Sequence, residues 1–144
     1  MTKSLTWSGL LPFLACLIWG ALNLPSADVA AETVFISYSA VILSFMAGTL
    51  WGRASHSPNT QHAPLLIASN IWALLAWVAV LFSQQPLWST VGLALLALGF
   101  IHLYRLEAER LHQALDTEYL GLRKRVTSAV VITHALMILV VVLR

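Results

Sequence analysis

Residues 38–52 read YSAVILSFMAGTLWG, an apolar run in which small side chains recur at a spacing of four. The run is long enough to form most of a membrane-spanning helix. Its small side chains belong to Ala40, Ser44, Gly48 and Gly52. Because positions four apart drift only slowly around a helix, these four residues form one small-residue stripe along the span. Such stripes are typical of helices that pack closely against another helix in lipid.

The whole chain has the composition of an integral membrane protein. Of its 144 residues, 59% are hydrophobic and only 10% are charged, and the mean hydropathy is +0.81. A crossing needs about 20 apolar residues. Uncharged apolar runs of about that length lie near 7–24, 33–52, 64–83, 87–104 and 126–143. The sequence therefore predicts an all-α membrane protein, a compact bundle of five transmembrane helices in a single integral-membrane domain over residues 1–144.

The basic residues predict how this bundle is oriented. One side of the predicted bundle carries Lys3, Arg53, Arg105, Arg110, Arg123, Lys124 and Arg125. The other side carries only Arg144. Since cytoplasmic loops are enriched in lysine and arginine, the N-terminus is expected in the cytoplasm and the C-terminus outside.

A polar segment, RLEAERLHQALDTEYLGLRKR, joins the fourth and fifth spans at residues 105–125. It places Leu111, Leu115 and Leu122 on one helical face, with charged residues elsewhere. This pattern predicts an amphipathic cytoplasmic helical segment, either separate or an extension of the fourth span. It would serve as a connector at the headgroup level or as a docking surface for a partner.

The first apolar run is interpreted as a transmembrane span and not as a cleaved signal peptide. Lys3 precedes it and FLAC at 13–16 weakly resembles a lipoprotein cleavage box, but cleavage before Cys16 would leave half a span. An Arg-rich and Ser-rich transit peptide is not recognisable in the sequence. We therefore expect a multi-pass protein of the bacterial inner (cytoplasmic) membrane.

Three stretches carry a resemblance to a known family: GLLPFLACLIWGAL at 9–22, YSAVILSFMAGTLWG at 38–52 and YLGLRKRVTSAVV at 119–131. In order and spacing the chain resembles the bacterial membrane family of unknown function number 3429, which is similar to transmembrane protein 69. The resemblance implies an intact five-helix domain and no assigned activity. Leu50 stands before Trp51 where members of that family often carry a polar residue, commonly histidine.

The small-residue stripe has two interpretations. In the first it packs inside the bundle, with the first span as its neighbour, where Pro12, Cys16 and Gly20 form a weaker matching row. In the second it is an interface for another membrane protein or for a second copy of this chain.

His134 is the ionisable side chain placed deepest in a predicted span, about midway along 126–143. A neutral imidazole donates one hydrogen bond and accepts another, so a structural bridge to Asn70 or to a serine of the second span is expected. The plausible companions are Asn70, Ser44 and Ser69. A quinone contact, a proton relay and a metal ligand are the functional alternatives.

Other chemistry finds little support in the sequence. His102 and His134 are expected to differ in depth by roughly 9 Å, which is poor for two axial haem ligands. The motifs of zinc proteases, phosphate-binding loops, serine hydrolases and paired cysteines are missing from the 144 residues, so we expect no cofactor and no metal site. Three further histidines, His56, His62 and His112, fall in polar segments.

The Trp51-Gly52-Arg53 cluster is placed at the end of the second span. Trp51 suits interfacial anchoring. Arg53 is expected to snorkel to the interface or to contact a lipid phosphate.

The absence of catalytic motifs favours a non-enzymatic accessory, assembly or interaction factor of a larger membrane complex. The alternative is a small lipophile- or quinone-binding or permeation protein that uses His134 and Asn70. The expected partners are the lipid bilayer and another membrane protein or the chain itself. A formal net charge of only +2 gives no indication of a nucleic-acid partner.

Overall fold

The computed structural model describes residues 2–25, 28–55, 63–111 and 115–144. Within these ranges all the regular secondary structure is helical. The helices are α1 (Thr2–Ser8), α2 (Leu11–Ala21), α3 (Ala31–Ser55), α4 (Ala63–Phe82), α5 (Pro86–Arg110) and α6 (Thr117–Val142).

Four of these helices, α3 to α6, are long and apolar enough to cross a membrane. They coincide with the predicted spans at 33–52, 64–83, 87–104 and 126–143, and three of them extend several residues further into polar sequence. The prediction of an all-α, multi-pass membrane protein is therefore confirmed. These helices are longer than the apolar runs that predicted them, because charged residues at the depth of the lipid headgroups are compatible with helical structure.

The first predicted span, 7–24, is not one continuous helix. α1 ends at Ser8, Gly9 and Leu10 form a turn, and α2 begins at Leu11 with Pro12 in its first turn. Proline has no N–H group and its ring clashes with the carbonyl group four residues earlier, so Pro12 prevents a regular helix from running through Ser8. The apolar stretch that results, Thr6–Ala21, is shorter than a standard span.

α2 also ends earlier than the sequence predicted, at Ala21 and not near residue 24. Asn23 adopts a left-handed conformation with φ of 47°. The amide of Asn23 donates to Gly20 and the amide of Leu24 donates to Trp19. This pair of bonds is the Schellman arrangement, which satisfies the last carbonyl groups of a helix and reverses the chain.

A tight turn joins α4 to α5, as predicted from Gln84, Gln85 and Pro86. The amide of Gln85 donates to Phe82, and the Ser89 hydroxyl donates to the Ser83 carbonyl at 2.8 Å. Proline suits the first position of a helix because the amide missing there would be unpaired in any case.

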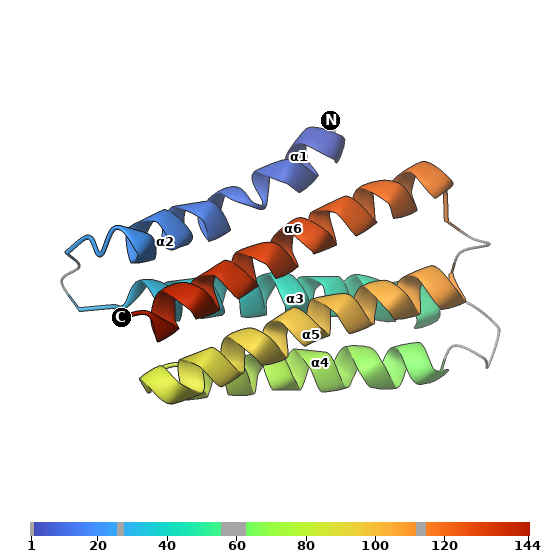
Figure 1. The fold of residues 1–144 in the computed structure, drawn as a ribbon. Helices are drawn as coiled ribbons and strands as arrows, with labels where there is room; N and C mark the ends of the chain where they lie inside the picture. The colour runs from blue at the N-terminus through green and yellow to red at the C-terminus, as the bar shows by residue number, and fades with distance from the viewer. Residues whose placement is uncertain (1, 26–27, 56–62, 112–114) are drawn as a thin grey trace.

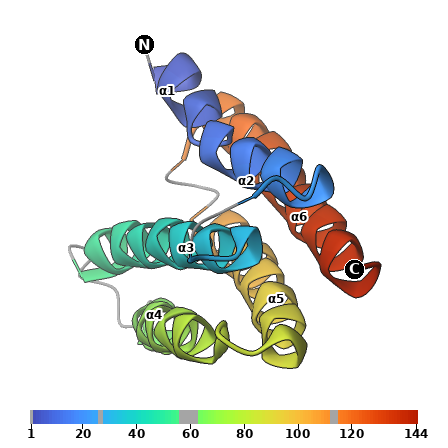
Figure 2. The same cartoon turned by 90° about the vertical axis from the view of Figure 1, so that its left-hand side faces the viewer.

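α3 occupies the centre of the bundle. It packs most extensively against α4 and also against α2 and α5, while α6 packs against α5 and α2 (Figures 1 and 2). In Figure 1 the C-terminal end lies at the left end of the bundle, whereas α1 lies above α6 and continues from α2 toward the right. The core is apolar and aromatic, with Phe13, Phe35, Leu43, Phe100 and Met137 almost inaccessible.

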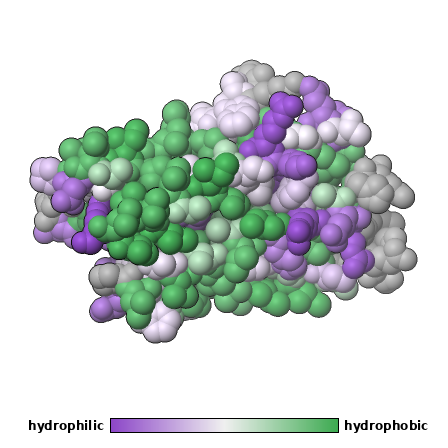
Figure 3. All heavy atoms as spheres, in the orientation of Figure 1, coloured by the Kyte–Doolittle hydropathy of each residue, from purple (hydrophilic) through white to green (hydrophobic). Residues whose placement is uncertain are grey.

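The surface has the character expected for contact with lipid. Large apolar side chains such as Phe45, Trp77 and Leu98 are more than half exposed. Apolar side chains cover much of the face in Figure 3, and hydrophilic side chains gather toward its ends. This distribution agrees with a membrane-embedded bundle, because lipid, unlike water, does not penalise exposed apolar area.

The polar segment at 105–125 is divided between two helices. Residues up to Arg110 extend α5, and Thr117 begins α6, where the Asp116 side chain accepts a hydrogen bond from the Glu118 amide. Residues 112–114, including the histidine at 112, lie outside the described residues. The alternative in which this segment extends the fourth span therefore holds for its first part.

Candidate functional site

The small-residue stripe divides into a buried part and an open part. Ala40 is buried with 6% of its surface exposed, and Ser44 is half-buried. A Cβ atom added to Gly48 or Gly52 would meet no neighbouring atom within 4 Å among the described residues. The Cβ positions of the two glycines are therefore open toward the described part of the bundle.

A shallow groove between α3 and α4 contains Gly48. Ser44, Gly48 and Trp51 of α3 line it, opposite Ser69, Asn70 and Ala73 of α4, and its volume is about 150 Å³. The groove shows that the stripe faces α4 here, so the expectation that the first span is its neighbour was wrong for these residues. In the first span, Gly20 instead lies beside Val140 of α6, the C-terminal Arg144 and Ala31 of α3.

The glycine on which packing depends is Gly99 of α5, which sequence reasoning missed. A Cβ atom there would lie 2.7 Å from Leu43 Cδ2 and 2.8 Å from Trp72 Cε3. α5 therefore approaches α3 and α4 through this residue. Its sequence context, LALGFI, has no four-residue stripe that would have marked it.

His134 is fully buried at the meeting point of α2, α3, α5 and α6. Its Nε2 lies 2.7 Å from Ser39 Oγ and its Nδ1 lies 2.7 Å from the carbonyl oxygen of Val130. The rings of Phe13, Phe35 and Phe100 pack around the imidazole at centroid distances of 5.6, 4.9 and 5.5 Å. The predicted bridge to a serine of the second span is confirmed, but the partner is Ser39 and not Ser44, the serine expected from the sequence.

The geometry also fixes the tautomer of His134. A carbonyl oxygen only accepts, so the Nδ1–H group donates to Val130. In the neutral imidazole Nε2 then accepts from the Ser39 hydroxyl. Both ring nitrogens are occupied, which makes this a structural bridge between α3 and α6.

Asn70 is not brought to His134. It is exposed on α4, beside the α3–α4 groove, and its Nδ2 donates to the carbonyl oxygen of Leu66 in its own helix at 2.9 Å. The two residues proposed from the sequence as one intramembrane polar site therefore occupy different places.

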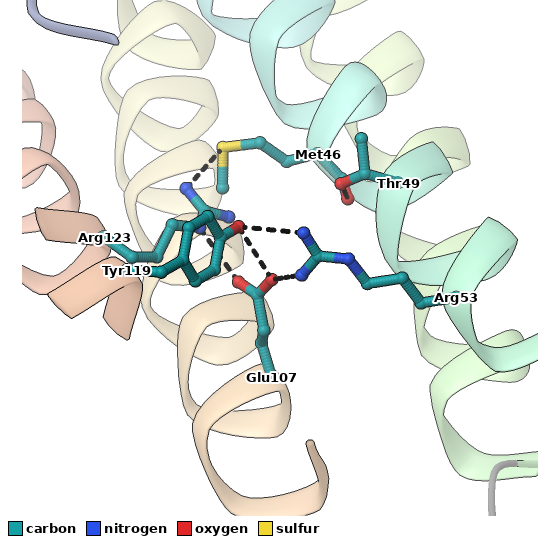
Figure 4. A network of polar contacts seen from close by, with 6 residues as sticks. All are labelled: Met46, Thr49, Arg53, Glu107, Tyr119 and Arg123. Carbon is teal, nitrogen blue, oxygen red and sulfur yellow. Dashed lines mark hydrogen bonds and ion pairs between the residues drawn. The ribbon is translucent and has the colours of Figure 1, made fainter. Parts of the chain in front are cut away.

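A buried ion cluster lies where α3, α5 and α6 meet at the arginine-rich end (Figure 4). Glu107 of α5, only 3% exposed, is at its centre. Oε1 accepts from Arg53 Nη1 and, at 3.1 Å, from the Tyr119 hydroxyl, while Oε2 accepts from Arg123 Nε at 2.9 Å. Arg53 Nη2 also donates to the Tyr119 hydroxyl at 3.3 Å. Two arginines therefore share one carboxylate, which leaves a surplus positive charge.

This Glu107 cluster was not predicted from the sequence and corrects one expectation. The charges of residues 105–125 were expected on an exposed helical face, whereas Glu107 is buried. The Arg53 guanidinium pairs with Glu107, and 37% of the Arg53 side chain stays exposed, so its predicted contact with the membrane interface stays a prediction. With its oxygens committed to hydrogen bonds and ion pairs, the carboxylate acts as a clamp for three helices.

Trp51 is exposed at one end of α3, as its predicted anchoring role requires, and also lines the α3–α4 groove. His102 accepts a hydrogen bond at Nδ1 from Trp72 Nε1 at 2.6 Å, joining α5 to α4. The histidines at 56 and 62 lie outside the described residues. Within the described ranges, no three His, Cys, Asp or Glu side chains are placed to hold a metal ion.

Comparison with known proteins agrees with the resemblance noted in the sequence. Transmembrane protein 69 of Xenopus tropicalis is 37% identical over 81 residues, which is 54% of this chain and 31% of that protein. The match thus spans about a third of that relative's length. No solved structure matches the chain. The family model described as "Protein of unknown function (DUF3429)" matches residues 1–139, and the chain therefore belongs to this family.

Proposed function

We propose that this protein is a non-enzymatic interaction factor that docks a transmembrane helix of a partner membrane protein into the groove between α3 and α4. The observation that carries the proposal is the open space over Gly48, where an added Cβ atom would meet no described atom within 4 Å. The same groove offers Ser44 and Ala73, so its floor is made of small side chains on both helices.

Open glycines on a membrane helix favour close approach by another helix. Association in lipid depends on van der Waals contact between closely packed backbones, which small residues permit. Glycine is about 1 kcal/mol less favourable than alanine within a helix. A glycine against which nothing packs therefore lowers the stability of the helix without a compensating contact. Since neighbours within the bundle close the Cβ position of Gly99 but leave that of Gly48 open, a contact outside the bundle accounts best for a glycine at position 48.

Asn70 supplies a polar contact beside the same groove. A side-chain amide exposed at membrane depth is unfavourable unless a partner satisfies it. The bond to Leu66 uses one N–H group of Asn70. The described residues offer no further partner, so the amide oxygen is available for a hydrogen bond across the interface, worth about 0.6–2 kcal/mol in membrane proteins.

The occupant is a single helix with small side chains and a hydrogen-bonding residue such as serine. The groove of about 150 Å³ is smaller than the roughly 300–1,000 Å³ of small-molecule sites, which favours a helix ridge over a bound ligand. The experiment below distinguishes a helix of a different protein from a helix of a second copy of this chain.

The test is quantitative mass spectrometry of a tagged copy at native expression, extracted together with its surrounding lipid. Gly48→Leu should fill the groove, and Gly121→Leu is the matched control because Gly121 of α6 is equally open but lies outside the groove. We expect a stoichiometric partner with wild type and Gly121→Leu that is lost with Gly48→Leu, while all three proteins fold. Retention of the partner by Gly48→Leu, or its absence from wild type, would overturn the proposal; recovery of the same chain alone would replace the partner by a homo-oligomer.

We further propose that α1 and α2 together make the fifth crossing, with the arginine-rich end of the bundle in the cytoplasm of a bacterium. α2 alone has 11 residues and a length of about 16 Å, too short for a hydrocarbon core of about 30 Å. α1 and α2 run in nearly the same direction (Figure 1), so the two together have sufficient length. Reporter domains fused to either end test this, and activity of a periplasmic reporter at the N-terminus would contradict it.

A further inference from the structure

A cavity of about 710 Å³ lies between the N-terminal helices and the rest of the bundle. Leu10 and Phe13 line it from one side, Ile42 and Met46 of α3 from another, and the first half of α6 completes it. Its volume falls within the roughly 300–1,000 Å³ of small-molecule sites. The cavity is separate from the α3–α4 groove, so a ligand bound in it is independent of any helix docked in that groove.

One face of α6 gives the cavity a gradient of polarity. Tyr119, Arg123, Thr127 and Val130 line it at spacings of three and four and therefore share one helical face. From Tyr119 to Val130 this face extends about 16 Å at 1.5 Å per residue. It is polar and cationic at the Tyr119 end and apolar at the other, where Phe13 and Phe100 also lie. A site of this shape matches an amphiphile with a small head and one apolar chain.

Thr127 contributes a buried hydroxyl group without a partner. The residue is only 5% exposed, and its Oγ1 makes no hydrogen bond within the described part of the chain. Threonine in a helix commonly donates to a carbonyl of the preceding turn. Thr133 does so, donating to Val130 at 2.7 Å, whereas Thr127 does not. An unpaired buried hydroxyl costs about 1–3 kcal/mol, which a ligand oxygen at this point in the cavity would offset.

Arg123, one turn before Thr127, has donors to spare. Its Nε donates to Glu107, and Nη1 contacts Met46 Sδ at 3.2 Å (Figure 4). A thioether is a weak acceptor, and a guanidinium group has five N–H donors. The remaining N–H groups find no acceptor among the described residues. The surplus positive charge of the Glu107 cluster therefore lies at the polar end of the cavity.

Two carboxylates at the cavity rim limit the charge of the ligand. Asp116 and Glu118 are both exposed, and the Asp116 carboxylate caps α6 by accepting from the Glu118 amide at 3.2 Å. Like charges repel, so these groups disfavour a doubly charged phosphate head. A single carboxylate, held by Arg123 and Thr127, is compatible with the rim.

We propose that this cavity binds a single-chain anionic amphiphile, a long-chain carboxylate. Its head accepts hydrogen bonds from Arg123 and Thr127, and its chain lies toward Phe13, Phe100 and Val130. Charge-assisted contact between a guanidinium and a carboxylate is short and strong, which favours the acid over an uncharged ester of the same chain.

The experiment uses the full chain in phospholipid nanodiscs with a photoactivatable palmitate that carries a diazirine in mid-chain. Crosslinked residues are mapped by mass spectrometry, and unlabelled palmitate and methyl palmitate are titrated as competitors. We expect crosslinks near Phe13 and Val130 and more effective competition by palmitate than by its ester. Thr127→Val should weaken competition by palmitate roughly three- to tenfold, the loss of about one hydrogen bond.

The matched control is Thr133→Val, because Thr133 is a buried threonine of the same helix that does not line the cavity. This variant should bind palmitate as wild type does. Arg123→Lys should reduce the preference for the acid, since lysine keeps the charge but loses the two-pronged contact. Equal competition by acid and ester, crosslinks confined to the outer surface, or equal effects of Thr127→Val and Thr133→Val would each overturn the proposal.

Discussion

Ser39 of α3 and His134 of α6 are joined by a hydrogen bond of 2.7 Å in the interior of the bundle. The bond connects residues 95 positions apart in the sequence. Because His134 Nδ1–H is committed to Val130, the Ser39 hydroxyl is the donor that satisfies Nε2. Removing this hydroxyl leaves an unpaired acceptor enclosed by three phenylalanine rings.

We therefore expect Ser39→Ala to lower the free energy of unfolding by about 1–2 kcal/mol, within the range for leaving a buried acceptor unpaired. Unfolding in mixed micelles of increasing denaturing detergent measures this. Ser37→Ala is the control, because the Ser37 hydroxyl donates to Thr33 within its own helix. Equal effects of the two substitutions would show that the bridge to His134 adds nothing.

Glu107 is expected to be the most sensitive charged residue of the bundle. Glu107→Gln leaves Arg53 and Arg123 without their shared counter-charge, and breaking a buried ion pair in this way costs about 3–5 kcal/mol. Lys124→Gln, next to Arg123 on α6 and exposed, should change stability by less than about 0.5 kcal/mol. The comparison is made by the same detergent titration, and similar midpoints for the two variants would contradict the clamp assigned to Glu107.

Substitutions of Gly99 and Gly48 distinguish a glycine needed for packing within the bundle from one that lines the proposed docking groove. Gly99→Ala places a methyl group against Leu43 and Trp72 and should destabilise by about 1–3 kcal/mol through overpacking. Gly48→Ala meets no neighbour and should leave stability unchanged or raise it by up to about 1 kcal/mol through helix propensity. Thermal unfolding in nanodiscs distinguishes them, and a loss of stability in Gly48→Ala would place that glycine in the folding core.

These contrasts show which features of the fold are local. Apolar runs and the Gln84-Gln85-Pro86 turn are properties of neighbouring residues, so four of the five predicted spans were found as continuous helices, with the predicted turn between α4 and α5. Pro12 was also visible, but its consequence, the break between α1 and α2, was outweighed by the continuous apolar run around it. Hydropathy averages over a window and is insensitive to a single missing N–H group.

The candidate sites depend on contacts between distant residues, which a single sequence does not contain. Arg53, Glu107 and Arg123 come from three helices, and their charges look like ordinary interfacial charges until the helices are placed together. The spacing of Gly48 and Gly52 predicted a helix interface but could not say whether the bundle itself supplies the partner. The prediction of a structural bridge for His134 was correct because a buried imidazole has few ways to pair both of its nitrogens. A hydrogen bond to a serine of α3 is one of these ways.

Thr127 allows the cavity to be tested without any ligand. In delipidated protein, Thr127→Val removes a buried hydroxyl that has no partner, so stability should stay the same or increase. Thr133→Val removes a hydroxyl that donates to Val130 and should cost about 0.5–1.5 kcal/mol. Unfolding midpoints of the two variants measure the difference. If Thr127→Val proves as costly as Thr133→Val, the Thr127 hydroxyl has a partner within the protein and is not free to hold a bound head group.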